Sequence, residues 1–208
     1  MTKPEIILCD LDGTIAEITH RLHFISEEIT VGSWVKPKNV PYARLMKQQV
    51  IGSTYDPMNY DNVWITDKGN KYQTHELHKL KFYKSFFEAA KDDSPIQTTI
   101  EIVKCLSEKW PVVFCSGRPD NYRQITVNWI ASYLPWVNGL LGAPRPQDYL
   151  IMRPAGDTRP DYVVKEELYH KYIEPNYTVK AVFDDRKVVV DMWRGLGLQC
   201  YAVCEGNY

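Results

Sequence analysis

The sequence lacks both a long hydrophobic run and an excess of charge of one sign. Its 208 residues include 25 Lys plus Arg and 26 Asp plus Glu, a formal net charge of −1. Because this balance creates no general attraction to a polyanion, any nucleic-acid contact is expected to be local. No apolar run approaches membrane-spanning length, and the first residues lack the pattern of a signal peptide. These absences predict a cytoplasmic protein with no membrane partner.

Cysteines are few and irregularly spaced. The five of them, at positions 9, 105, 115, 200 and 204, are an odd number without the close pairing of a zinc site. Most are expected to be buried, reduced thiols. Cys115 is excluded as the nucleophile of a tyrosine-phosphatase-like loop, because that loop needs an arginine where Asn121 stands. Cysteine chemistry is therefore not expected.

Short apolar runs alternate with segments of helical period along most of the chain. Strands are expected at 5–9, 112–115, 149–152, 178–183 and 199–203, and helices at about 95–109, 120–132, 164–172 and around 189–193. Ser94 and Gln97 suggest a capping box, with Pro95 at the first helical position. Strands that alternate with helices predict an α/β protein with a doubly wound parallel sheet.

One segment breaks this alternation. Residues 27–81 are too long for a simple connection, are rich in Tyr, Trp, Gly and Asn, and show no clear period over most of their length. They are predicted to form a cap inserted after the first strand. Residues 1–26 and 82–208 are then the core.

Polar residues follow three of the predicted strands, and the first group is the string DLDGT. Asp10 and Asp12 are two positions apart and can project toward the same side, while Gly13 permits a sharp exit from the strand. Ligands of open parallel sheets bind beyond the carboxyl ends of the strands. A polar turn is one alternative; a calcium loop fails because its twelfth position is Arg21 instead of Glu. We therefore interpret the two aspartates as catalytic.

The other two strand ends carry groups suited to a phosphate and to a cation. Ser116, Gly117 and Arg118 offer a hydroxyl, backbone N–H groups and a guanidinium, although the same string also occurs in ordinary strand-to-helix turns. Asp184 and Asp185 repel one another unless a cation offsets their charges, so a metal site is favoured over a solvated loop pair.

Lys165 is a further candidate because it lies near the start of a predicted helix. Its charge there could balance a nucleophilic carboxylate and an arriving phosphate, with a surface lysine as the alternative. The five histidines form no set that suggests metal ligands.

Taken in order, DLDGT at 10–14, SGR at 116–118, Lys165 and DD at 184–185 resemble the four motifs of the haloacid dehalogenase-like phosphatases. Within that superfamily, the strings GDTRPDYVVKEE, FDDRKVVVDMWR and EGNY are similar to the 3′-phosphatase domain of phage polynucleotide kinase-phosphatase. The resemblance covers the whole predicted core and implies a Rossmann-like fold.

The resemblance implies a Mg²⁺-dependent phosphatase that works through an aspartyl-phosphate. Asp10 would attack phosphorus, Asp12 would protonate the leaving oxygen and later activate water, and Lys165 would be the motif lysine. The implied Mg²⁺ ligands are Asp10, the backbone carbonyl of Asp12, Asp184 and, directly or through water, Asp185. The implied phosphate contacts are Thr14, Ser116, Gly117, Arg118, Arg21 and Arg153.

The substrates implied by the resemblance are nucleic-acid 3′-phosphate ends. A 5′(3′)-nucleotidase acting on monophosphates and a non-catalytic nucleotide-binding module are the alternatives. The chain departs from the phage domain in its insertion, and it has no GxxxxGK[ST] loop, so no kinase activity is expected. The insertion could restrict the site to mononucleotides or hold a base by stacking, although packing is the alternative for each aromatic residue. The stacking candidates are Tyr42, Tyr55, Tyr60, Trp64 and Tyr72.

Overall fold

The computed structural model describes residues 2–22, 24–25, 50–51, 63–66, 71–73, 83–137 and 149–206. By its internal contacts the chain divides into two compact units, Leu22–Tyr83 and Met1–Arg21 with Lys84–Tyr208. Residues 27–81 fall within the first of these units. Their role as a cap stays a prediction.

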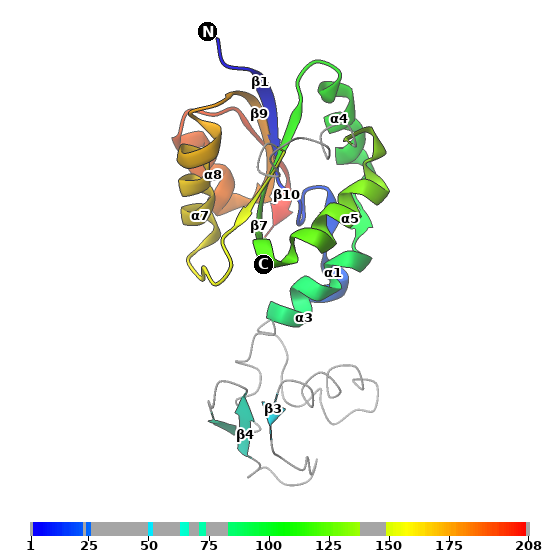
Figure 1. Ribbon diagram of the computed structural model, residues 1–208, viewed down its shortest axis with the longest axis vertical. Coiled ribbons are helices and arrows are strands. Elements are labelled where there is room, and N and C mark those ends of the chain that lie inside the picture. Colours follow the sequence, from blue (N-terminus) through cyan, green and yellow to red (C-terminus); the bar gives the residue numbers. More distant parts are fainter. Residues whose placement is uncertain are drawn as a thin grey trace. The chain divides into compact units, whose positions relative to one another are not determined.

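A five-stranded parallel sheet forms the centre of the larger unit (Figure 1). Its strands are β1 (Glu5–Cys9), β7 (Val112–Pro119), β8 (Leu150–Arg153), β9 (Thr178–Arg186) and β10 (Cys200–Gly206). The spatial order is β10-β9-β1-β7-β8, and all neighbours pair in parallel. From β1 the chain adds β7 and then β8 on one side, and it later returns to add β9 and β10 on the other side. Such a switch point places a ligand crevice at the ends of β1 and β9.

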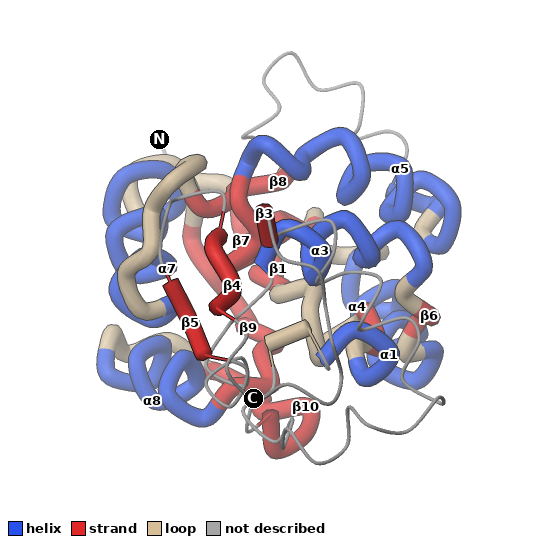
Figure 2. Tube along the Cα trace, turned by 90° about the horizontal axis from the view of Figure 1, so that it is seen from below, coloured by secondary structure: helices blue, strands red, loops and turns tan. Residues whose placement is uncertain are grey.

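Helices cover both faces of this sheet, as Figure 2 shows in the view along the strands. One face carries α4 (Gln97–Ser107) and α5 (Arg123–Tyr133). The other carries α7 (Asp161–Leu168), which continues as a π-helical turn at Tyr169–Ile173, and α8 (Lys187–Gly195). Alternate residues of β1 join opposite apolar clusters, Ile7 with one face and Leu8 with the other. The prediction of a doubly wound α/β fold is confirmed.

Shorter elements complete the two units. In the larger one, β2 (Ala16–Glu17) pairs antiparallel with β6 (Ser94–Pro95), and 3-10 turns lie at Ala89–Asp92, Asp120–Tyr122 and Pro135–Val137. Helix α1 spans Thr19–Leu22, where the division between the units falls. Helix α3 spans Tyr83–Glu88. In the smaller unit, β3 (Val50–Ile51), β4 (Val63–Thr66) and β5 (Lys71–Gln73) form an antiparallel sheet. Trp64 and Tyr72 are register partners there, whereas positions 42, 55 and 60 lie outside the described residues.

The predicted capping box before α4 is wrong. Ser94 and Pro95 form β6, and the helix begins after Ile96 without a side-chain cap. The Ile96 N–H donates to the carbonyl of Ile15 at 2.8 Å, so this segment is held by β2 and its flanking residues instead of by its own side chains. The pairing fixes the position of Asp93, the residue directly before β6.

Two strands extend further than their apolar runs predict. β7 continues to Pro119, where it pairs with Arg153, and β9 continues to Arg186, where it pairs with Gly206. Register shifts accompany both extensions. The SGR string and the two late aspartates therefore belong to the strand ends themselves.

The remaining general predictions concern thiols and membrane helices. Positions 9, 115 and 200 are buried and positions 105 and 204 are exposed, and all five cysteines are free, so most are buried thiols as expected. Within the described part of the chain, no helix combines the length and apolar character needed to cross a membrane.

Candidate active site

Three carboxylates meet at the carboxyl ends of β1 and β9. Asp10 follows β1 directly, and Asp184 and Asp185 lie near the end of β9. One oxygen of each residue lies within 4.8 Å of the others, and all three residues are buried. The Asp10 N–H donates to the carbonyl of Phe183 at 2.9 Å, which fixes the alignment of the two strands. The structure thus brings together acids that are more than 170 positions apart in the sequence.

Asp10 presents a buried oxygen that no described group satisfies. Its Oδ2 lies 3.1 Å from the Lys165 ammonium, whereas its Oδ1 is buried and has no hydrogen-bond partner among the described residues. Burial raises the pKa of Asp10 well above its usual value; Lys165 opposes this rise, and Asp184 and Asp185 add to it. Excess negative charge on buried oxygens is the environment that Mg²⁺ neutralises. The residues present therefore fit a divalent cation.

Lys165 lies inside the site. Its side chain is 0% exposed, and its Nζ is 2.9 Å from Asp184 Oδ2 and 3.5 Å from Asp161 Oδ2, in addition to its contact with Asp10. Burial alone would lower the pKa of Lys165, but the surrounding carboxylates raise it well above the usual range. The ammonium is therefore a fixed positive charge beside the candidate nucleophile, and the surface alternative is excluded.

Asp12 lies among arginines. Arg21 Nη2 donates to Asp12 Oδ1 at 2.7 Å, and Arg118 donates to the same oxygen from Nε at 2.8 Å and also from Nη2. Burial would raise the pKa of Asp12, but Arg118 and Arg21 outweigh it and lower the value to about 2. Asp12 is therefore ionised at neutral pH.

Both arginines are in turn held by Asp93, which no sequence motif marks. Asp93 is 0% exposed and accepts from Arg21 Nε at 2.7 Å, from Arg21 Nη2 at 2.8 Å and from Arg118 Nη2 at 2.7 Å. His20 Nε2 lies 2.9 Å from its Oδ1. Arg21 and Arg118, predicted to contact phosphate, are almost fully buried and bind these carboxylates. In this structure they orient Asp12.

Asp161 is the second site residue without a predicted role. It is the first residue of α7, accepts from Arg153 Nη2 at 3.0 Å and lies 3.7 Å from Arg186 Nη1. Arg153, also predicted for phosphate, donates from Nε to the carbonyl of Gly117 at 2.8 Å and so joins the ends of β8 and β7. The available signal was the spacing of four between Asp161 and Lys165, because residues four apart share a helix face.

Thr14 and Ser116 are buried hydroxyl residues at the same strand ends. Thr14 Oγ1 donates to Asp185 Oδ1 at 3.1 Å, which ties the first motif to the last. Ser116 Oγ accepts the N–H of Arg118 at 3.2 Å and retains its own hydrogen to donate. Of the two, Ser116 is thus the better placed to donate to a phosphate oxygen, and Thr14 orients a carboxylate.

Residues 78–208 match the family model described as the polynucleotide kinase PNKP phosphatase domain. The chain belongs to this family. It is accordingly a phosphatase, and the resemblance noted from its four motifs is confirmed. A putative bifunctional polynucleotide kinase/RNA ligase of Autographa californica nuclear polyhedrosis virus is 34% identical over 129 residues, 59% of this chain and 17% of the viral protein.

Solved structures share the fold of this PNKP-type phosphatase. Two of them, described as the Pnkp1/Rnl/Hen1 RNA repair complex and the Pnkp1/Rnl/Hen1 complex, give TM-scores of 0.56 and 0.58. Each is 24% identical and covers 99% of this chain. The chain spans 44% and 47% of those proteins, so it corresponds to less than half of either.

The family match begins after the DLDGT string. Asp10 and Asp12 therefore lie outside the matched residues, whereas Lys165, Asp184 and Asp185 lie inside them. The link between the two parts is structural: Asp10 contacts Lys165 and meets both late aspartates. The first motif of the PNKP-type phosphatase thus joins the matched residues in three dimensions.

The arginines around Asp12 predict a pH-dependent contribution to stability. Because its folded pKa is about 2, below the usual value of 3.8, the carboxylate stabilises the fold above about pH 4 and loses this effect as the pH falls toward 2. Asp12→Asn should therefore lower the free energy of unfolding by about 2 kcal/mol near pH 7. Urea unfolding in EDTA, compared at pH 7 and pH 3, measures this; a difference independent of pH contradicts the assignment.

Gly117 leaves the space that Asp161 fills. A Cβ at position 117 would overlap Asp161 Oδ1 and lie 3.0 Å from its Cγ. Gly117→Ala should therefore displace Asp161 from Lys165 and reduce kcat/KM roughly 10- to 100-fold in a folded protein. Gly195→Ala is the matched control, because nothing lies within 4 Å of a Cβ there. Equal rates for the two variants would show that the position of Asp161 is not required.

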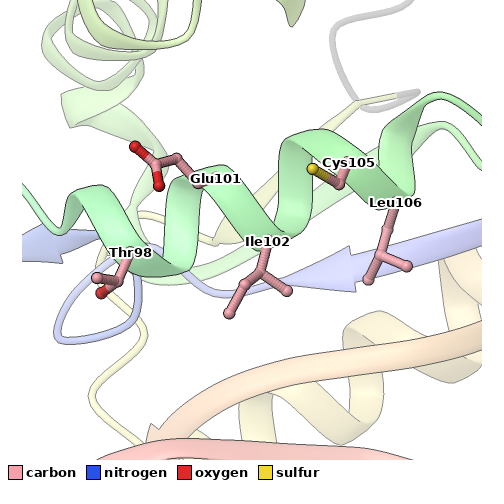
Figure 3. A pocket seen from close by; sticks show the side chains of 5 residues that line it. All are labelled: Thr98, Glu101, Ile102, Cys105 and Leu106. Atoms are coloured by element: carbon pink, nitrogen blue, oxygen red, sulfur yellow. The ribbon is translucent and has the colours of Figure 1, made fainter.

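A pocket of about 470 Å³ lies away from the carboxylates, on the surface of α4. Its lining residues all come from that one helix, as Figure 3 shows: Thr98, Glu101, Ile102, Cys105 and Leu106. This lining contains no cation and a single acid, so it suits neither a phosphate nor a metal.

Proposed function

We propose that this phosphatase removes 3′-phosphates from nucleic-acid ends in a Mg²⁺-dependent reaction with Asp10 as the nucleophile. The observation that carries the proposal is the state of Asp10: one of its oxygens contacts the buried Lys165, and the other is buried without a hydrogen-bond partner among the described residues. An oxygen of Asp10 also lies within 4.8 Å of oxygens of Asp184 and Asp185. Membership of the PNKP phosphatase family supports nucleic-acid ends as the substrate class.

Asp10, Asp184, Asp185 and the backbone carbonyl of Asp12 would hold Mg²⁺, which when bound supplies positive charge to the phosphate and the nucleophile. A carboxylate oxygen of Asp10 forms a bond to phosphorus while the bond from phosphorus to the 3′-oxygen breaks, giving an acyl phosphate. Lys165 offsets the negative charge that accumulates on the phosphate and the carboxylates. Water then cleaves the acyl phosphate and regenerates Asp10.

In its ionised state Asp12 is suited to the second step, in which water cleaves the acyl phosphate. As an ionised carboxylate it can accept a proton from the attacking water. For the first step it must carry a proton to the leaving oxygen, and a phosphate monoester bound as its monoanion can supply that proton. The two arginines hold the carboxylate in position for both transfers.

A substrate panel tests this function. A 3′-phosphorylated oligonucleotide, in DNA and RNA forms, is assayed beside nucleoside 3′- and 5′-monophosphates, each with Mg²⁺ and with EDTA. We expect Mg²⁺-dependent release from the oligonucleotide. Activity confined to 5′-monophosphates would instead identify a nucleotidase, the function that the smaller unit, Leu22–Tyr83, favours if it restricts access. Release unaffected by EDTA contradicts the role of the metal.

A further inference from the structure

Asp184 has a hydrogen-bond donor that comes from the apolar core. The indole Nε1 of Trp193 donates to Asp184 Oδ2 at 3.2 Å. Trp193 is 1% exposed, lies on α8 and packs edge-to-face against Tyr169, with ring centroids 5.9 Å apart and an interplanar angle of 74°. Because packing fixes the ring, the direction of this N–H is fixed as well.

The contacts of Asp184 divide unequally between its two oxygens. Oδ2 accepts from Lys165 at 2.9 Å and from Trp193 at 3.2 Å. Oδ1 has only a 3.3 Å contact from the N–H of Arg186 within the described part of the chain. Two donors on one oxygen prevent the carboxylate from turning over and leave the other oxygen for a cation.

Lys165 alone cannot fix this arrangement. Its ammonium is shared among Asp184, Asp10 and Asp161, and it ends a flexible stem. If it moves toward an arriving phosphate, its bond to Asp184 weakens. The indole N–H is then the donor that remains, since Trp193 has no freedom to follow.

We infer that Trp193 is a positioning residue that orients Asp184 as a metal ligand. The inference rests on the proposed function, because it requires that the carboxylate cluster binds a divalent cation. Outer hydrogen bonds to metal ligands typically change metal affinity 10- to 100-fold. Loss of the indole N–H should therefore weaken binding of the cation even where the fold and the ligands themselves are intact.

The test measures metal binding without turnover. Mn²⁺, a paramagnetic substitute for Mg²⁺, is titrated into protein previously treated with EDTA, and free Mn²⁺ is followed by electron paramagnetic resonance. Trp193→Phe removes the N–H and keeps an aromatic ring. Replacement of Trp193 by 3-benzothienylalanine, which puts sulfur in place of the N–H at nearly constant shape, covers the case in which the phenylalanine variant does not fold.

Trp129→Phe is the matched control. Trp129 is 2% exposed on the opposite face of the sheet, and its indole N–H donates at 2.8 Å to the backbone carbonyl of Asp93. Trp129→Phe therefore makes the same change of side-chain volume and removes a similar buried hydrogen bond. The indole of Trp129 does not, however, donate to a carboxylate of the Asp10, Asp184 and Asp185 cluster. Asp184→Asn serves as the variant in which binding is removed.

We expect the Kd for Mn²⁺ to rise at least about 10-fold in both Trp193 variants and to stay near the wild-type value in Trp129→Phe. Unchanged affinity in a folded Trp193 variant, with binding lost in Asp184→Asn, overturns the role of Trp193 and leaves the proposed function intact. Equal weakening by Trp129→Phe also overturns it, because the effect is then one of packing. Wild-type protein that binds no Mn²⁺ overturns the inference together with the metal site.

Discussion

Asp10→Asn is expected to reduce phosphate release by at least about 10⁴-fold while the metal-free protein becomes more stable. The amide cannot form the acyl phosphate, because it lacks the nucleophilic carboxylate oxygen. Its effect on stability should be favourable, because burial beside Asp184 and Asp185 disfavours the charged form of Asp10 and raises its pKa, and one of its oxygens lacks a partner among the described residues. Removal of that charge relieves repulsion within the cluster.

The gain in stability should be roughly 0.5–2 kcal/mol in EDTA, as for other substitutions that remove functional strain. Saturating Mg²⁺ should then stabilise the wild type more than the variant, because a ligand raises stability only to the extent that it binds the folded protein. Thermal unfolding followed by circular dichroism, with and without Mg²⁺, measures both effects.

Asp191→Asn makes the same change at an exposed position of α8, where Asp191 pairs with Lys187. It should alter neither activity nor stability appreciably. A destabilised Asp10→Asn protein in EDTA would mean that Lys165 satisfies Asp10 better than the geometry indicates. Persistent activity would remove Asp10 as the nucleophile.

The carboxylate cluster could be predicted from the sequence because it follows from a rule of sheet architecture. Asp10, Ser116 and Asp184 each follow the apolar run of a strand, and parallel strands end at one edge of their sheet. No knowledge of side-chain contacts was needed to bring them together. Lys165 was harder, since a single lysine on a helix is usually at the surface, and its burial became clear only from the packing of α7.

The residues that hold the site in place could not be predicted in the same way. Asp93 is indistinguishable from the adjacent Asp92 in the sequence; it is positioned by the pairing of β6 with β2, where local propensity favoured a helix start. Trp193 was visible only as one apolar position of a helix, because its bond to Asp184 depends on how α8 packs on β9. A contact between side chains of different elements leaves no periodic signal.

The arginines show a further limit. Their presence near the motifs was evident, but the sequence does not distinguish a guanidinium that binds phosphate from one that binds a carboxylate, since both partners present paired oxygens. Arg21 and Arg118 are committed to Asp12 and Asp93 in this structure. Substitution of either arginine therefore tests the orientation of Asp12 instead of phosphate binding.

Asp93→Asn should lower kcat/KM toward a 3′-phosphorylated oligonucleotide roughly 10²- to 10³-fold, the range associated with proton transfer. Asp93 shares the two arginines with Asp12. When its charge is removed, both guanidiniums act on Asp12 alone, which further disfavours the protonated form of Asp12 that donates to the leaving oxygen and frees the arginines to move. A buried ion pair that loses one partner also destabilises the fold, by about 3–5 kcal/mol.

The choice of leaving group separates impaired proton transfer from general damage. An alkoxide leaving from a nucleotide needs a proton, whereas the stable nitrophenolate leaving from p-nitrophenyl phosphate does not. Asp93→Asn should therefore retain most of its activity toward p-nitrophenyl phosphate. His20→Gln, which alters only the partly exposed contact of Asp93, should stay within about 3-fold of wild type on both substrates. Equal losses of Asp93→Asn on both substrates would mean that Asp93 maintains the fold and does not act through Asp12.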